Sequence, residues 1–566
     1  MNWKIKKPDQ DHVDRLASEL SVSRVVAWVL LNRGINDAEK AKEFLSPSLD
    51  NLKADTPPAG ADKAVARIAE ALEKGETIGI HGDYDVDGIT GTAIMDRFLR
   101  ELGGKTISYL PHRQKEGYGM KPAGVEELHK KGAGLIISVD CGVNDHEAVE
   151  RSNRLGTDVI VVDHHQLPET LPPAHAIVNP RLPDCPYNSE ELAGAGVAFY
   201  LCIALRAHLR KLGKIKNGPN LKAYLDLVAL GTIADVVPLT GMNRVLVHFG
   251  LSELAAGRRP GIIQLKRVAG LGEGPVGVGQ VSFRLAPRLN AMGRLDAADP
   301  ALELLLSENE REAGIIADKL EELNRTRQSV EERILEEADK ALGLMEGGHL
   351  APGLAVAGQG WHVGVIGIVA SRLTDTYYRP SAVIGVHNGE GRGSLRSVPG
   401  VNIYKVLERC SHLLEVFGGH PSAAGLTIKE DNIPRFLEYF PEAVAEEAPD
   451  FEYEPYLSVD AEWPVSKCDQ ELVKDLARLK PHGIGNPEPS FCARGVLVKW
   501  AREGRSNTLL MGVEEKEVTL PAVGFRMGDR LPEPGDRLDI VYIPKLNTWK
   551  GDESVQLEIK DLRVIS

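Results

Sequence analysis

Three aspartates and a histidine lie close together early in the chain, in a segment that reads HGDYDVDG from His81 to Gly88. Asp83, Asp85 and Asp87 alternate along it, directly after a short apolar run. Carboxylates this close repel one another unless a cation lies between them, and hard divalent cations prefer oxygen ligands. The alternatives are a solvated acidic turn or a calcium loop, but the glutamate that a calcium loop needs further on is missing. The segment therefore indicates a divalent-metal site, if other ligands converge on it.

Further aspartates and histidines follow in three later motifs. Asp140 lies in SVDCG, Asp163 precedes His164 and His165, and Asp235 interrupts the apolar run GTIADVVPL. Two adjacent imidazoles after a carboxylate favour metal ligation over a buried structural histidine. For Asp235, a helix-capping role remains the alternative, because a buried charge needs a partner of some kind.

The elements that precede these motifs must bring them together. Residues 61–162 alternate short apolar runs with amphipathic stretches, which predicts an α/β fold with a parallel sheet. The expected strands are Thr77 to Ile80, Thr106 to Leu110, Gly134 to Val139 and Asp158 to Val162. Ligands of such sheets sit at the carboxyl ends of the strands, and three of the polar motifs fall there. We therefore expect one site at this edge of the sheet.

The rest of the chain predicts several further units, since 566 residues exceed the size of one ordinary domain. A charged amphipathic stretch indicates a long connecting helix, a second alternating region indicates another α/β lobe, and the C-terminal part is rich in short β-like runs. The expected units are a helical cap at 1–55, a catalytic domain at 56–300, the connecting helix at 301–346, the second lobe at 347–450 and a β-barrel at 451–566.

Composition bounds the cellular setting. The six cysteines form no CxxC pair, no apolar stretch approaches the length of a membrane span, and no apolar segment follows the basic start, so we expect a cytoplasmic protein without a membrane partner. The net charge of −14 argues against a nucleic-acid partner at face value. A carboxylate cluster that holds cations makes a chain look more acidic than its loaded form, so the objection is weak.

The four motifs HGDYDVDG, SVDCG, DHH and GTIADVVPL, in this order, resemble those of the DHH phosphoesterases. Their wording is closest to the RecJ exonuclease branch, and APRLNAMGRL, GWHVGVIGIVASRL and PHGIGNPEPSF are also typical of it. The resemblance covers nearly the whole chain. It implies a DHH catalytic domain, a DHHA1 substrate-binding domain and a C-terminal OB-type barrel that binds nucleic acid.

The resemblance also implies two manganese or magnesium ions in one site. Their implied ligands are His81, Asp83, Asp85, Asp87, Asp140, His164, His165 and Asp235. Asp140 is expected to bridge the ions, and Asp140, His165 and His420 to take part in catalysis. Two alternatives stay open: Asp83 either binds metal or orients His81, and Asp163 either binds metal or orients a ligand.

Glycines and arginines of the second lobe resemble the substrate-binding motifs of the same family. They lie in GRGSLRS and in FGGH, where glycine allows close approach of the backbone to a phosphate and arginine offers a planar fork to its oxygens. The implied substrate-binding residues are Arg113, Arg294, Ser394, Arg396, Gly418, Gly419 and His420. Arg294, Ser394 and Arg396, joined by Arg113, are expected around a terminal 5′-phosphate. Structural salt bridges across the cleft are the alternative for Arg294 and Arg396.

The implied function is a single-stranded-DNA-specific 5′-to-3′ exonuclease of DNA repair and recombination that releases mononucleotides. Its expected partners are single-stranded DNA, a helicase and a single-stranded-DNA-binding protein, and the expected state is a monomer. Two other functions are weighed against it: a phosphoesterase of the same superfamily that cleaves oligoribonucleotides or dinucleotides, and a non-catalytic replication scaffold. The C-terminal barrel argues against the first, and the retention of Asp or His at every expected ligand position argues against the second.

Overall fold

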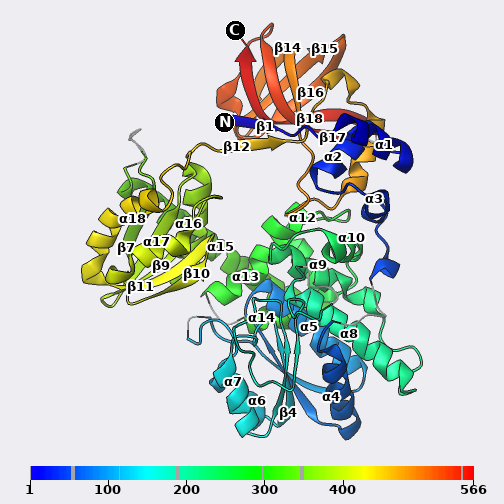
Figure 1. The fold of residues 1–566 in the computed structure, drawn as a ribbon, viewed down its shortest axis with the longest axis vertical. Helices are drawn as coiled ribbons and strands as arrows, with labels where there is room; N and C mark the ends of the chain where they lie inside the picture. The colour runs from blue at the N-terminus through cyan, green and yellow to red at the C-terminus, as the bar shows by residue number, and fades with distance from the viewer. Residues whose placement is uncertain are drawn as a thin grey trace.

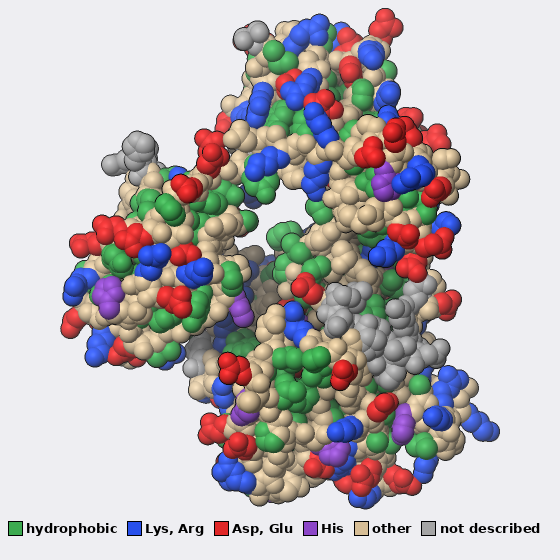
Figure 2. All heavy atoms as spheres, in the orientation of Figure 1, with side chains coloured by type: hydrophobic (Ala, Val, Ile, Leu, Met, Phe, Trp, Pro, Cys, Tyr) green, Lys and Arg blue, Asp and Glu red, His purple; other side chains and the backbone are tan. Residues whose placement is uncertain are grey.

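A computed structural model of the chain describes residues 2–52, 58–113, 115–185, 191–295, 298–343, 350–549 and 552–565. Figure 1 shows an α/β lobe at the bottom, a second α/β lobe at the left and a β-barrel at the top, with both ends of the chain beside the barrel. The domain boundaries expected after residues 55 and 346 lie outside the described residues. Figure 2 shows that the three lobes enclose an opening.

The first lobe is built on a five-stranded sheet in the order β3-β2-β4-β5-β6, with all neighbours parallel. Its strands are β2 (Thr77–Gly82), β3 (Lys105–Tyr109), β4 (Ala133–Val139), β5 (Asp158–Val162) and β6 (Ala176–Val178). The central strands are almost wholly buried, as expected for a parallel sheet covered on both faces. The α/β fold predicted from the sequence is confirmed, and β6 is an additional strand.

Helices cover both faces of this sheet (Figure 1). One face packs on α4 (Ala61–Lys74), α5 (Val86–Glu101) and α8 (Gly194–Lys211), and the other on α6 (Pro122–Lys130) and α7 (His146–Arg154). Each face has its own apolar cluster, because successive strand residues point to opposite sides. The polar motifs emerge at the edge between these two layers.

A helical half completes the catalytic lobe. Its elements are α9 (Leu225–Ala234), α10 (Gly241–Ala256), α11 (Pro260–Val268), α12 (Val278–Gln280), a π-helical turn (Val281–Leu285), α13 (Ala286–Leu295) and α14 (Asp299–Leu306). Helix α9 has no polar face and is buried throughout, which is why it packs inside the lobe against α5 and α8. Its C-terminal end therefore carries Asp235 to the sheet edge.

Helix α15 (Glu310–Ala341) joins the two α/β lobes, since it packs on α11, α13 and α14 at one end and on α16 at the other. The side chain of Asn309 caps it by accepting hydrogen bonds from the amides of Arg311 and Glu312. This cap separates α15 from α14, so the amphipathic stretch expected as one helix forms two. None of the helices in the described part of the chain has the length and apolar character needed to cross a membrane.

The second lobe contains a five-stranded sheet in the order β10-β11-β9-β8-β7. Its strands are β7 (Leu354–Gln359), β8 (Ser381–His387), β9 (Glu390–Arg396), β10 (Val416–His420) and β11 (Ala423–Lys429), and its helices are α16 (Val363–Tyr377), α17 (Ile403–Arg409) and α18 (Ile433–Glu447). Only β7 and β8 pair in parallel among these strands. Helix α16 packs on β8 and β9, which places the GRGSLRS strand beside it.

The C-terminal barrel closes through β14, which pairs with both β15 and β17. Its strands are β13 (Ala461–Glu462), β14 (Phe491–Gly504), β15 (Thr508–Glu515), β16 (Val518–Gly524), β17 (Arg537–Trp549) and β18 (Asp552–Ile565). The expected OB-type barrel is confirmed.

The N-terminal helices share one core with this barrel. Helices α1 (Gln10–Leu20), α2 (Arg24–Asn32) and α3 (Ala38–Leu45) pack in the same apolar cluster as the inner faces of the barrel strands and helix α19 (Gln470–Leu476). Strand β1 (Asn2–Ile5) pairs in parallel with β12 (Tyr456–Val459). The two ends of the chain thus form a single packed unit, which we call the terminal unit.

Candidate metal centre

Asp140 follows β4 in an unusual backbone conformation. Its φ of 63° lies in the left-handed region, which a non-glycine residue adopts only at a cost. Its amide donates to the carbonyl oxygen of Val162 over 2.9 Å, so the turn is tied to the end of β5. A side chain at Gly194 would come within 2.7 Å of the Asp140 Cβ. Glycine at the start of α8 therefore makes room for the carboxylate.

Asp163 is saturated with hydrogen bonds. Its Oδ1 accepts from the amides of His164 (2.7 Å) and His165 (3.1 Å) and lies 2.7 Å from His165 Nδ1, and its Oδ2 accepts from the amide of Val143 over 3.0 Å. Burial acts to raise the pKa of Asp163, but the hydrogen bond and charge of His165 outweigh it and lower that pKa. Asp163 thus orients the two histidines as a fixed carboxylate.

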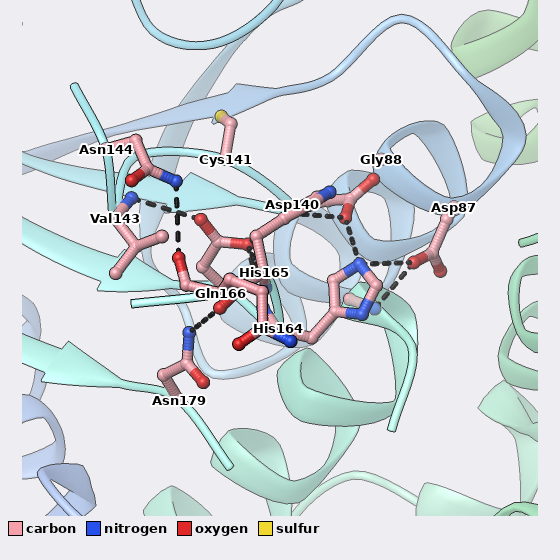
Figure 3. A network of polar contacts seen from close by, with 12 residues as sticks. Asp87, Gly88, Asp140, Cys141, Val143, Asn144, His164, His165, Gln166 and Asn179 are labelled. Atoms are coloured by element: carbon pink, nitrogen blue, oxygen red, sulfur yellow. Dashed lines mark hydrogen bonds and ion pairs between the residues drawn. The ribbon is translucent and has the colours of Figure 1, made fainter. Parts of the chain in front are cut away.

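His164 lies at the centre of the ligand cluster. Its Nε2 is 3.1 Å from Asp140 Oδ1, 3.8 Å from Asp235 Oδ2 and 4.0 Å from Asp87 Oδ2, and Figure 3 shows the ring between Asp140 and Asp87. Burial, assisted by the charge of His165, lowers the pKa of His164 to about 4. The imidazole is therefore neutral at physiological pH, which is the form that binds metal.

The ligand atoms form overlapping groups, within each of which all atoms lie within 4.8 Å of one another. The groups are Asp83 with Asp85 and Asp140, Asp87 with His164 and Asp235, and Asp140 with Asp163, His164 and His165. Asp140 belongs to two of these groups, and its Oδ1 is nearer to His164 Nε2 than the oxygens of Asp235 and Asp87 are. This overlap is what two neighbouring cation positions with Asp140 between them require.

The electrostatics of these groups call for a cation. Burial, followed by repulsion from neighbouring carboxylates, raises the pKa of Asp140 well above its usual range, that of Asp87 to about 7 and that of Asp235 to about 9. Five expected ligands each have a buried atom with no hydrogen-bond partner among the described residues: His81 Nε2, Asp83 Oδ1, Asp140 Oδ1, His164 Nε2 and Asp235 Oδ2. A mixed set of carboxylate oxygens and imidazole nitrogens fits Mn²⁺ and also accepts Mg²⁺.

Asp85 and Asp87 are held by main-chain amides. Asp85 caps α5 through Oδ1, which accepts from the amides of Asp87 (2.9 Å) and Gly88 (3.0 Å). Asp87 accepts from two amides at the start of α8, over 2.5 and 2.9 Å. These bonds aim both carboxylates at the sheet edge and leave further lone pairs for a cation.

His81 lies on the face of β2 that packs against α6. On β2, Ile78 and Ile80 belong to the apolar cluster of α4, α5 and α8, whereas Gly79 abuts Leu128 of α6, so the alternation of the strand sends His81 to the α6 face. The centre of its ring lies 5.1 Å from that of the Tyr109 ring, with the two planes tilted by 38°, and burial lowers the pKa of His81 to about 4. No ligand group among the described residues includes it. His81 Nε2 is buried and has no hydrogen-bond partner among the described residues, and the ligand role expected for His81 stays a prediction.

Tyr118 is a site residue that the sequence reasoning missed. Its hydroxyl lies 2.9 Å from His165 Nε2 and 3.5 Å from the carbonyl oxygen of Asp140, and its side chain is about half exposed. Burial of the hydroxyl, together with the charge of Asp140, raises its pKa. Asn290 was missed as well; its Oδ1 accepts from the amide of Val86 over 3.1 Å and so ties α13 to the start of α5. Asn290 lies within the APRLNAMGRL stretch, whereas Tyr118 belongs to none of the motifs named above.

The structure brings the expected phosphate-binding residues together between the lobes. Arg294 Nη1 donates to the carbonyl oxygen of Gly364 in the first turn of α16 over 3.0 Å, and Arg396 Nη1 donates to Ser394 Oγ over 3.1 Å. A side chain at Gly367 would come within 3.0 Å of Ser394 Oγ and 3.3 Å of Arg396 Nη2. Helix α16 therefore approaches the Ser394 and Arg396 side chains closely because it carries glycine there.

Positive charge accumulates at this point. Burial lowers the pKa of Arg294 to about 10, and the charges of Arg113, Arg327 and Arg396 contribute to the lowering. The guanidinium of Arg113 lies 5.2 Å from the ring centre of Tyr84, within the HGDYDVDG segment. Several guanidiniums that face one another in this way favour an anion between them.

Gly418, Gly419 and His420 lie on β10, the edge strand of the second lobe, and all three are exposed. Gly419 has a φ of 146°, and a side chain there would come within 2.5 Å of the Ala423 carbonyl oxygen, so this glycine is required by the β10–β11 hairpin. Gly418 faces open space. The ligand groups found among the described residues do not include His420, and its expected catalytic role stays a prediction.

The fold and this site together define a class: residues 77–232 match the DHH family, N-terminal domain, and residues 351–446 match the DHHA1 domain. Residues 459–561 match the RecJ OB domain. The chain is 37% identical over 572 residues to the single-stranded-DNA-specific exonuclease RecJ of Bacillus subtilis (strain 168), covering 100% of this chain and 71% of that protein. It is 36% identical to the protein of the same name in Escherichia coli (strain K12), covering 99% and 98%. The chain therefore belongs to the RecJ family.

Solved structures agree with this assignment. RecJ from Thermus thermophilus in complex with Mn²⁺ superposes with a TM-score of 0.83 at 32% identity, covering 99% of this chain and 79% of that one. The same protein in complex with Mg²⁺ superposes with a TM-score of 0.78 at 31% identity, covering 99% and 78%. Both metals suit the donor set found here.

Proposed function

We propose that this chain is a metal-dependent exonuclease that degrades single-stranded DNA from its 5′ end and releases mononucleotides. The observation that carries the proposal is the pair of ligand groups that share Asp140, because a shared carboxylate between two cation positions suits phosphodiester hydrolysis. The names of the relatives that match along the whole chain support the choice of single-stranded DNA.

Two divalent cations bound there would supply Lewis-acid stabilisation of the charge that develops on the phosphate and the leaving oxygen. In the proposal, Asp83, Asp85 and Asp140 would hold one ion, and Asp87, His164 and Asp235 would hold the other, with Asp140 Oδ1 3.1 Å from His164 Nε2. The His165 Nδ1 is hydrogen-bonded to Asp163, and the Nε2 of the same ring lies 2.9 Å from the Tyr118 hydroxyl. Burial opposes protonation of His165, yet the hydrogen bond that its Nδ1 donates to Asp163 raises the pKa of His165, which suits it to donate a proton or to stabilise negative charge.

We assign the 5′-to-3′ direction of degradation to the arginine side chains that lie between the two α/β lobes. Arg294, Ser394 and Arg396, with Arg113, would bind the terminal 5′-phosphate and so place the first phosphodiester at the metal centre. In the proposal, the protein is a cytoplasmic monomer that takes part in DNA repair and recombination. It would act on strands that a helicase opens and a single-stranded-DNA-binding protein covers.

The function is tested with purified protein and a single strand labelled at either end. In Mn²⁺ we expect release of labelled mononucleotide from the 5′-labelled strand first, no reaction in EDTA, and slower hydrolysis of dinucleotides and duplex. Asp140→Asn should remove activity while the circular dichroism spectrum is kept. Cys141→Ala is the matched neighbour: its thiol contacts His81 and main-chain oxygens and points away from the cluster in Figure 3, so activity should persist. Wild-type activity of a folded Asp140→Asn protein would contradict the proposal.

A further inference from the structure

A cavity of about 410 Å³ lies between the terminal unit and the catalytic lobe. Side chains between residues 33 and 47, in and around α3, form one wall, and residues 240–245 at the start of α10 form the other. Figure 1 shows α3 just above α10 at the right of the molecule. None of the expected metal ligands is among the described residues that line the cavity. Small-molecule sites have volumes of about 300 to 1,000 Å³, so the cavity is large enough for a ligand of its own.

Three cationic side chains line this cavity, those of Arg33, Lys40 and Arg244, and only one carboxylate, that of Glu43, lines it with them among the described residues. None of the three cations forms an ion pair within the described part of the chain. Arg33 Nε donates to Asn486 Oδ1 over 2.8 Å and its Nη2 to a main-chain carbonyl oxygen, and Arg244 also donates to main-chain carbonyl oxygens. These acceptors are uncharged. The cavity therefore carries an excess of positive charge, in a chain whose net charge is −14.

Two of these cations are shielded from water. Arg244 is 2% exposed, and burial, together with the charge of Arg33, lowers the pKa of Arg244 to about 10. Burial also lowers the pKa of Arg33, and the charge of Asp460 offsets this effect only in part. A buried charge without a counter-ion is costly. An anion bound beside the two guanidiniums would therefore relieve their mutual repulsion.

Helix α10 adds main-chain donors to the same cavity. The side chain of Thr240, the residue before the helix, makes no capping hydrogen bond, and Thr240 and Gly241 both line the cavity. The first amides of a helix have no acceptor within it, and the dipole of this helix of 16 residues adds positive potential at the same end. Helix N-termini of this kind bind phosphate groups. Positive potential thus comes from two independent sources, the cationic side chains and the start of α10.

Much of the remaining lining is apolar. Ile35, Phe44 and Pro47 of the terminal unit line the cavity together with Met242 and Val245 of α10. An inorganic anion would contact only the charged part of this lining. A ligand that joins a phosphate to a flat group with apolar faces would contact both parts, and a nucleotide has this composition.

We propose that this cavity is a binding site for a mononucleotide, separate from the metal centre. The phosphate would lie at Arg33, Lys40 and the start of α10, and the base would contact the apolar side chains of the lining. The inference goes beyond the proposed function, which enters only in the choice of a mononucleotide, the kind of molecule that the proposed reaction releases. A nucleotide bound there would contact the terminal unit and the catalytic lobe at once, next to the contacts of Arg244 with Phe44.

The test uses the full-length protein in EDTA, so that no strand is degraded. Photolabelling with 8-azido-deoxyadenosine monophosphate, followed by mass spectrometry, should mark peptides from residues 33–47 or 240–245, and excess dAMP should prevent the labelling. Calorimetry should give a Kd for inorganic phosphate at least about 10-fold above that for dAMP, because phosphate lacks the contacts of the base. Lys40→Glu, at an exposed position of α3, should raise the Kd for dAMP about 10-fold and reduce the labelling.

The matched control is Lys42→Glu, since Lys42 lies on the same helix, is exposed, pairs with Glu39 and does not line the cavity. Its Kd for dAMP should equal that of the wild type. The inference is overturned if the label appears only at the arginine side chains between the two α/β lobes, if phosphate binds as tightly as dAMP, or if the two lysine variants have equal affinity. The proposed function is judged separately: a wild type that degrades no single strand in Mn²⁺ contradicts it, whatever binds in EDTA.

Discussion

Arg244 of the catalytic lobe donates two hydrogen bonds, of 3.1 and 2.9 Å, to the carbonyl oxygen of Phe44 in the terminal unit. Its guanidinium also lies 3.9 Å from the centre of the Phe44 ring and donates to the carbonyl oxygens of Leu479 and Arg478 over 3.0 Å each. Only 2% of the residue is exposed, and burial lowers its pKa to about 10, so it stays charged near neutral pH. A single buried cation thus ties the catalytic lobe to both ends of the chain.

Replacing Arg244 by alanine should lower the free energy of unfolding by on the order of 2 to 4 kcal/mol, because three buried carbonyl oxygens lose their donors. Urea unfolding followed by tryptophan fluorescence measures the loss. Arg258→Ala is the control, since Arg258 is exposed and its ion pair, with Glu253, does not join the lobes. An Arg244→Ala midpoint equal to that of the control would show that the lobes are held together by other contacts.

The sequence could predict the lobes but not how they meet. The alternation of apolar residues is a local pattern, so strands such as β4 and β5, and the barrel, could be predicted from it. The pairing of Asn2 with Tyr456 was not, because nothing in either short segment specifies a partner so far along the chain. Removing the barrel after Glu454 would consequently uncover the apolar faces of α1 to α3, and such a truncation is not a clean test of the barrel.

The positions of those site residues that directly follow a strand of the parallel sheet could be predicted from the order of the strands. Parallel strands end at one edge, so Asp140 and His164 had to meet once the sheet was recognised. The spacing of His81 from Asp85 does not reveal which face of β2 His81 occupies, so its place on the α6 side could not be predicted. Tyr118 was missed because it reaches His165 from a loop, and loop geometry leaves no periodic signal.

Asp83 and Asp163, whose roles the sequence left open, differ in their hydrogen bonds, and we predict different roles for them. Asp83 joins Asp85 and Asp140 in a ligand group and its Oδ1 has no hydrogen-bond partner among the described residues, whereas Asp163 is fully engaged by His164, His165 and Val143. We expect Asp83→Asn to lose one equivalent of Mn²⁺ and more than about 100-fold in activity. Asp163→Asn should keep both ions with affinity and activity reduced about 10- to 100-fold.

Metal titration by calorimetry and turnover on single strands distinguish the two variants. Asp62→Asn, at a surface position of α4, controls for loss of a charge. If Asp83→Asn retains both equivalents of Mn²⁺, Asp83 orients other groups rather than binding the ion.

The stability of the metal-free protein should fall as pH rises from about 7 to about 9. The pKa of Asp87 is raised to about 7 and that of Asp235 to about 9, both above the value of about 3.9 in an unfolded chain, so the folded state binds more protons in this window. Each proton lost with rising pH then favours unfolding. The lowered pKa of His164 acts in the opposite direction, but only below about pH 6.5, outside the window.

Thermal unfolding with EDTA at about pH 7 and about pH 8.5 measures this slope. Added Mn²⁺ should stabilise more at the higher pH, since protons compete with it for the same carboxylates. In Asp235→Asn the slope should be smaller, because one titrating group is removed. A metal-free protein that is more stable at the higher pH would contradict the prediction.

The last prediction concerns the choice of the 5′ end, which the metal centre cannot make because its ligands do not distinguish the direction of a strand. Arg396 is bonded to Ser394 beside α16, and its charge acts on Arg294. If these groups bind a terminal phosphate, Arg396→Ala should erase most of the preference for 5′-phosphorylated over 5′-hydroxyl strands and leave Mn²⁺ binding intact. Arg392→Ala is the matched control, since Arg392 lies on the same strand β9, is exposed and pairs with Glu390. Cleavage of both substrates by each variant decides the matter: an unchanged preference in Arg396→Ala, or degradation that starts at the 3′ end, would show that the cluster is a set of structural contacts between the lobes.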